Sequence, residues 1–120
     1  MAKTILIVDD SASLRLVVSI ALKGAGYKTV EACDGVDALK KLASNQINLI
    51  ISDVNMPNMD GISMIKEVKK LSAHKFTPII MLTTESQTGK KSEGQAAGAR
   101  AWVVKPFQPQ QMIVAVAKLI

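Results

Sequence analysis

The sequence holds few of the residues that would indicate a cross-linked, metal-clustered or membrane protein. Its 120 residues include a single cysteine, Cys33, which excludes an internal disulfide and a cysteine-based metal cluster. We interpret Cys33 as a small apolar residue near a turn. The first apolar run, Ile5 to Val8, is far too short for a signal peptide or a membrane span. We therefore expect a cytoplasmic protein without a membrane partner.

Aromatic residues are scarce as well: the chain has one tyrosine, one tryptophan and two phenylalanines. The net charge of +5 raises nucleic acid as a partner. The basic residues are scattered, however, in runs no longer than pairs such as Lys40-Lys41, and no aromatic platform lies among them. We expect a solvated basic surface and no nucleic-acid partner. Four prolines and a hydrophobic content of 48% indicate one compact domain over residues 1–120.

Short apolar runs alternate along the chain with segments in which apolar residues recur at helical spacing. This alternation predicts an α/β fold, a parallel sheet with right-handed crossovers and helices on both faces. The expected architecture is a single-domain, doubly wound (βα)5 fold of the flavodoxin-like type, with the common strand order 2-1-3-4-5. The expected strands cover residues 4–8, 27–32, 48–52, 79–82 and 101–104.

The helix expected between Gly89 and Gly98 is the weakest of the five. Its residues are mostly polar, and Gly94 lies inside it, which costs about 1 kcal/mol of helix stability relative to alanine. We expect this segment to be the least stable helix of the domain.

Polar and charged residues stand where four of the five expected strands end. Asp9 and Asp10 follow the first strand, Asp53 the third, Thr83 the fourth and Lys105 the fifth. The carboxyl ends of parallel strands meet at one edge of the sheet, and ligands bind there where the strand order reverses. The sequence therefore predicts an acidic rim, which we define as these five residues.

The composition of the acidic rim indicates a particular chemistry. Three carboxylates repel one another, and oxygen ligands without histidine or cysteine favour a hard divalent cation, above all Mg²⁺. An aspartate carboxylate can attack phosphorus and form an acyl phosphate. The added negative charge would need a metal, a cation and a hydroxyl donor, and Lys105 and Thr83 supply the last two.

Taken together, these residues resemble the receiver domain of two-component response regulators, and most of all the single-domain chemotaxis regulators of that family. The resemblance covers the whole chain. It is carried by six segments: Ile7-Val8-Asp9-Asp10, Asp53-Val54-Asn55-Met56-Pro57, Met59-Asp60-Gly61, Thr83-Thr84, Gly98-Ala99 and Val104-Lys105-Pro106-Phe107.

The resemblance implies a signalling protein rather than an enzyme, although one that promotes its own phosphorylation and dephosphorylation. It implies a histidine kinase as phosphodonor, an output protein such as the flagellar motor switch, a phosphatase, and a monomeric state. Output would occur by protein contact, with the weak helix, the fifth strand and the last helix as the partner surface. The alternative is a single-domain receiver that acts as a phosphate sink or in a non-flagellar pathway.

The resemblance also assigns roles in the site. Asp53 would be the phosphoacceptor, carrying a 4-aspartylphosphate. Asp10, Asp53 and the backbone carbonyl of Asn55 would hold Mg²⁺, with Asp9 acting through bound water. Lys105 would contact a phosphoryl oxygen.

Two further residues would form a switch by the same resemblance. Thr83 would move toward the phosphoryl group, and Trp102 occupies the position of an aromatic residue that turns inward on activation. The peptide bond between Lys105 and Pro106 would be cis. Because side chains alternate along a strand, Trp102 should face away from the side that Lys105 takes, toward the weak helix or the solvent beside it.

Two other functions are compatible with a sheet of this type. A phosphohydrolase with an aspartate nucleophile would carry a second aspartate two residues on, where this chain has Asn55. A flavodoxin-like FMN carrier would need an uncharged phosphate loop where this chain has Asp9 and Asp10. Simpler roles suffice for Asp60-Gly61, a turn, and for His74, which lies in a polar loop and is not expected to be a ligand.

Overall fold

The computed structural model describes residues 2–84 and 91–120. Five parallel strands form one sheet in the order β2-β1-β3-β4-β5, which confirms the predicted fold and strand order. The strands are β1 (Thr4–Val8), β2 (Lys28–Ala32), β3 (Leu49–Asp53), β4 (Ile79–Thr83) and β5 (Ala101–Val104). The helices are α1 (Ala12–Gly24), α2 (Gly35–Ser44), α3 (Gly61–Lys69), α4 (Lys91–Ala97) and α5 (Pro109–Leu119).

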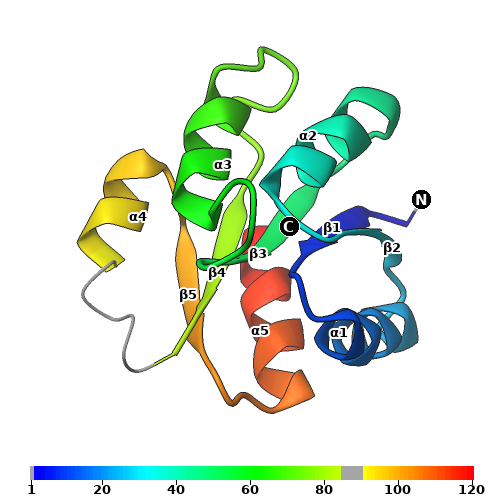
Figure 1. The fold of residues 1–120 in the computed structure, drawn as a ribbon. Coiled ribbons are helices and arrows are strands. Elements are labelled where there is room, and N and C mark those ends of the chain that lie inside the picture. The colour runs from blue at the N-terminus through cyan, green and yellow to red at the C-terminus, as the bar shows by residue number, and fades with distance from the viewer. Residues whose placement is uncertain (1, 85–90) are drawn as a thin grey trace.

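Helices cover both faces of the sheet, with α1 and α5 on one face and α2, α3 and α4 on the other (Figure 1). Successive strand residues point to opposite faces, so each central strand supplies both cores. Every residue of β3 and β4 is buried, which explains why both strands are apolar up to the polar residues at their carboxyl ends, without polar alternation. Within the described part of the chain, no helix is long and apolar enough to cross a membrane.

Side-chain caps fix the starts of three helices. Ser11, Asp34 and Asp60 accept hydrogen bonds from backbone N–H groups in the first turns of α1, α2 and α3 respectively. The sequence predicts only a turn at Asp60, and the structure shows that this residue is a helix cap as well. Each cap determines where a loop at the carboxyl edge of the sheet gives way to a helix.

Two single residues differ from their sequence interpretation. His74 is buried, and its ring nitrogens lie 3.3 Å from the carbonyl oxygen of Leu42 and 3.3 Å from Oγ1 of Thr77. It therefore ties the end of α2 to the segment before β4. Cys33 is exposed rather than packed as a small apolar residue. The predicted start of the fourth helix, at Gly89, lies outside the described residues.

Candidate functional site

Three aspartates meet at the carboxyl edge of the sheet. Asp9 directly follows β1, Asp10 comes next, and Asp53 is the last residue of β3. Because β1 and β3 are neighbours, carboxylate oxygens from the three residues lie within 4.8 Å of one another. Asp9 and Asp53 are buried, whereas Asp10 is exposed. The carboxylates of Asp9 and Asp53 are thus buried at the edge of the sheet, and that of Asp10 faces solvent.

Lys105, the residue after β5, reaches across the edge of the sheet to this cluster. Its Nζ atom lies 3.2 Å from Oδ2 of Asp53 and 3.3 Å from Oδ2 of Asp9. Among the described residues no other cation lies within ion-pair distance of any of the three carboxylates. One ammonium group against three carboxylates leaves the cluster with excess negative charge. The peptide bond between Lys105 and Pro106 is cis, as predicted.

Backbone N–H groups orient the two buried carboxylates. The N–H of Val54 donates to Oδ1 of Asp53 at 2.8 Å, and the N–H of Ser11 donates to Oδ1 of Asp9 at 2.8 Å. In each carboxylate one oxygen is thereby held by backbone and the other faces Lys105.

The electrostatic balance at Asp53 is unfavourable to its charge. Burial raises the pKa of Asp53, and this effect exceeds the opposing attraction of Lys105, while the charge of Asp9 raises the pKa further. The ionised carboxylate of Asp53 is therefore less stable than one in water. A second cation at the acidic rim would restore the balance.

The other predicted site residues lie close by on three different elements. Thr83 is the last residue of β4 and is buried. Asn55 is exposed in the loop that follows β3. Trp102 lies in β5, opposite Met81, and packs with it on the face covered by α2, α3 and α4, as predicted from strand alternation. Trp102 thus lies three residues before Lys105, but its indole is directed away from the carboxylates.

Contacts that the sequence analysis missed hold the loop after Asp53. Asn58 has a positive φ of 68°, and its Nδ2 donates to Oδ2 of Asp34 at 2.7 Å. The N–H of Gly35 donates to the carbonyl oxygen of Met59 at 3.3 Å. The N-terminus of α2 therefore holds this loop. The Asp34-Gly35 pair is a helix-start signal, but nothing local in the sequence links it to a residue 24 positions away.

Two more residues fix the backbone beneath the acidic rim. Arg15 of α1 donates to the carbonyl oxygen of Asp9 at 2.5 Å and pairs with Glu31 of β2 at 3.1 Å. Gly61 begins α3 directly behind the end of β3. A Cβ atom there would lie 2.8 Å from Cε of Met81 and still closer to the carbonyl oxygen of Asp53. Only glycine allows α3 to start so near the strand that carries Asp53.

The response regulator receiver domain model matches residues 5–117, and the chain belongs to that family. It is 41% identical over 108 residues to chemotaxis protein CheY1 of Helicobacter pylori, covering 88% of this chain and 87% of that protein. It is 34% identical over 112 residues to protein PilG of Pseudomonas aeruginosa, covering 93% and 83%. The solved chemotaxis response regulator CheY4 of Vibrio cholerae matches with a TM-score of 0.94 and 46% identity over 100% of both chains. The chain is accordingly a CheY-like response regulator of two-component signalling, as the sequence had indicated.

Proposed function

We propose that Asp53 is the phosphoacceptor of this response regulator. The observation that carries the proposal is the position of its carboxylate: at the end of a buried strand, with Oδ1 held by backbone and Oδ2 facing Lys105. A carboxylate oxygen of Asp53 would attack the phosphorus of a phosphohistidine on a CheA-like kinase. The new O–P bond forms as the P–N bond breaks, and the imidazole leaves with the electron pair. The product is an acyl phosphate.

We further propose Mg²⁺ as the cation of the acidic rim, held by Asp10, Asp53 and the backbone carbonyl of Asn55, with Asp9 acting through water. The donor set supports this assignment, because three carboxylate oxygens lie within 4.8 Å of one another. An octahedral Mg²⁺ at about 2.1 Å from its ligands spaces them about 3–4 Å apart. When bound, the ion supplies positive charge that offsets the charge of the phosphoryl oxygens.

Lys105 and Thr83 complete the proposed machinery. The ammonium group of Lys105 already faces Asp53 and would shift to a phosphoryl oxygen as negative charge moves outward from the carboxylate. Thr83, at the end of the neighbouring strand β4, would donate its hydroxyl to another phosphoryl oxygen and draw its loop along. Since positioning and charge come from this chain, a small donor should suffice in place of the kinase.

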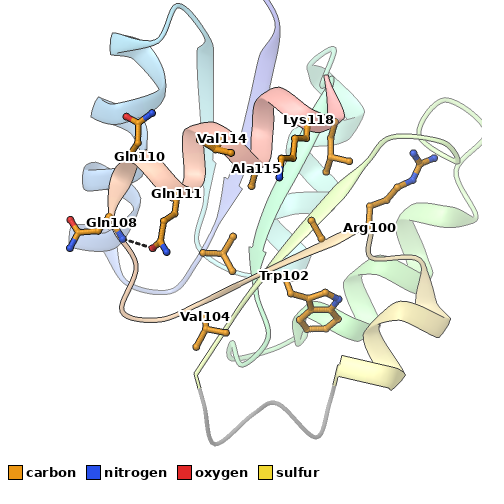
Figure 2. A pocket seen from close by; sticks show the side chains of 12 residues that line it. Arg100, Trp102, Val104, Gln108, Gln110, Gln111, Val114, Ala115 and Lys118 are labelled. Atoms are coloured by element: carbon orange, nitrogen blue, oxygen red, sulfur yellow. Dashed lines mark hydrogen bonds between the residues drawn. The ribbon is translucent and has the colours of Figure 1, made fainter.

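The face formed by α4, β5 and α5 is the proposed output surface, because Trp102 lies in β5 and Lys105 directly follows that strand. A groove of about 890 Å³ runs between β5 and α5 (Figure 2). Val104 and Val114 are 43% and 44% exposed within it, beside the cations Arg100 and Lys118. This mixture suits an amphipathic segment with acidic residues on an output protein such as the flagellar motor switch.

The direct test is incubation with acetyl phosphate and Mg²⁺, followed by intact-mass measurement. We expect one added phosphoryl group that is lost in mild base, no label on Asp53→Asn, and loss of labelling in Asp10→Asn. Asp60→Asn is the matched control, because asparagine also caps helices and Asp60 lies outside the acidic rim. It should label like the wild type. A base-stable label, or a labelled Asp53→Asn variant, would overturn the proposal.

A further inference from the structure

The indole of Trp102 contacts α4 at a glycine. Figure 2 shows the ring on the α4 side of β5. A Cβ atom on Gly94 would lie 2.6 Å from Cζ2 of Trp102 and still closer to Cη2, nearer than carbon atoms approach one another in proteins. Gly94 is buried, and its φ lies outside the left-handed region, so the backbone conformation does not require glycine. Glycine is required at this position because the side chain of Trp102 occupies the space that a Cβ atom would need.

This contact carries two unfavourable features. Glycine weakens a helix interior, and Gly94 lies within α4 (Lys91–Ala97). The indole Nε1 of Trp102 is buried without a hydrogen-bond partner among the described residues, which is also unfavourable. The orientation of the ring is therefore held by the shape of the space beside Gly94 and by apolar packing with residues such as Met81, rather than by a polar anchor.

We propose that Gly94 is the positioning residue for Trp102. The bare backbone at Gly94 seats the indole against α4 before any phosphorylation, so that α4 and the ring move as one unit. The consequence for signalling rests on the proposed function. Thr83 pairs with Val104, two residues after Trp102, so a displacement at the end of β4 would reach the ring and pass through Gly94 to α4. Activation would then shift α4 together with a ring that is already packed against it.

The positioning of Trp102 by Gly94 can be tested in the unphosphorylated protein, because Trp102 is the sole tryptophan and its fluorescence reports on this position alone. In Gly94→Ala the methyl group should displace the indole outward, with a red-shifted emission and a larger acrylamide quenching constant. Helix propensity alone predicts the reverse, since alanine strengthens α4 and should protect the ring.

Ala96→Gly is the matched control, because Ala96 is exposed on the same helix and the substitution weakens α4 without touching the ring. We expect its emission to stay at the wild-type position. An unshifted Gly94→Ala spectrum, or an equal red shift in Ala96→Gly, would overturn the assignment of Gly94 as the positioning residue for Trp102.

A second measurement uses the sign of a stability change. Phenylalanine lacks the Cζ2 and Cη2 atoms that a Cβ on Gly94 would meet. Gly94→Ala should therefore lower the Tm when Trp102 is present and raise it when Trp102→Phe is already in place. A change of the same sign in both backgrounds would show that Gly94 has no specific relation to the indole.

Hydrogen exchange separates this proposal from the phosphoacceptor assignment. With Mg²⁺ and beryllium fluoride, a phosphoryl mimic, amide exchange in α4 should change in the wild type and stay constant in Gly94→Ala. A response preserved in Gly94→Ala would overturn the coupling. A wild-type protein that fails to bind the mimic would contradict the role of Asp53. The positioning role of Gly94 would still be decided by the fluorescence spectra of the unphosphorylated variants.

Discussion

Replacing Gly61 by alanine should displace the backbone that carries Asp53, without changing any functional group of the candidate site. Gly61 begins α3, and its N–H donates to the carbonyl oxygen of Val54 at 2.8 Å. The added methyl group would meet Cε of Met81 at 2.8 Å and the carbonyl oxygen of Asp53 at a shorter distance. The methionine end can rotate away, but the backbone oxygen cannot. The start of α3 and the end of β3 must therefore separate.

The expected size of the effect follows from this geometry. Forcing a methyl group into a packed site costs about 1–3 kcal/mol. For a domain of 120 residues, 1 kcal/mol corresponds to about 4 °C in Tm, so the variant should melt about 4–12 °C lower. The same separation displaces the carboxylate of Asp53, and a misplacement of about 1 Å can reduce a reaction rate about 100-fold. Phosphorylation by acetyl phosphate should therefore slow far more than the loss of folded protein explains.

Calorimetry and the rate of mass change with acetyl phosphate, below the melting range of the variant, provide the two readouts. Gly24→Ala is the matched control, because a Cβ atom at Gly24 would meet nothing within 4 Å. It should raise stability by about 0.4–1 kcal/mol and leave the rate unchanged. If Gly61→Ala behaves like Gly24→Ala, the close approach of α3 to β3 does not position Asp53.

Three other predictions concern the charges and the loop of the site. Lys105→Met removes the cation 3.2 Å from Asp53 and should slow labelling by acetyl phosphate about 100-fold; an unchanged rate would remove Lys105 from the mechanism. Asn58→Ala removes the hydrogen bond to Asp34 and should weaken Mg²⁺ binding about tenfold by titration calorimetry, whereas equal affinity would show that this bond does not hold the loop. Burial raises the pKa of Asp53, so the native state binds more protons than the unfolded state between about pH 3.9 and the raised value, and stability falls as pH rises through that window. Asp53→Asn in EDTA should therefore melt above the wild type at neutral pH, with the difference closing below about pH 4; a lower Tm at neutral pH would contradict the sign.

The parts of the fold that could be predicted from sequence are those that follow from local patterns. β3 and β4 begin with unbroken apolar runs because both of their faces are buried, and that pattern alone marks them as central strands. The parallel arrangement then brings strand ends to one edge, which is why Asp9, Asp53 and Lys105 could be expected to meet before any distance was known. The orientation of Trp102 followed in the same way from alternation along β5.

The missed features depend on contacts between residues far apart in the chain. The sequence pattern marks Gly94 only as a weak point of a helix, whereas the structure shows that the indole of Trp102, eight residues further on, leaves no room for a side chain there. His74 is polar in sequence and buried in structure, because the end of α2 offers it the carbonyl of Leu42. Asn58 is held by Asp34 across 24 positions. Such pairs have no local periodicity, so only packing identifies them.

The central claim is that the buried carboxylate of Asp53, and neither of its two acidic neighbours, receives the phosphoryl group. Borohydride reduces an aspartyl phosphate to homoserine and leaves free carboxylates unchanged, so reduction followed by peptide mass spectrometry locates the modified residue. After treatment with acetyl phosphate, homoserine should appear at position 53 when Mg²⁺ is present and disappear when EDTA replaces it. Homoserine at Asp9 or Asp10 would contradict the account, as would an unmodified position 53 in protein whose mass shows that it carries a phosphoryl group.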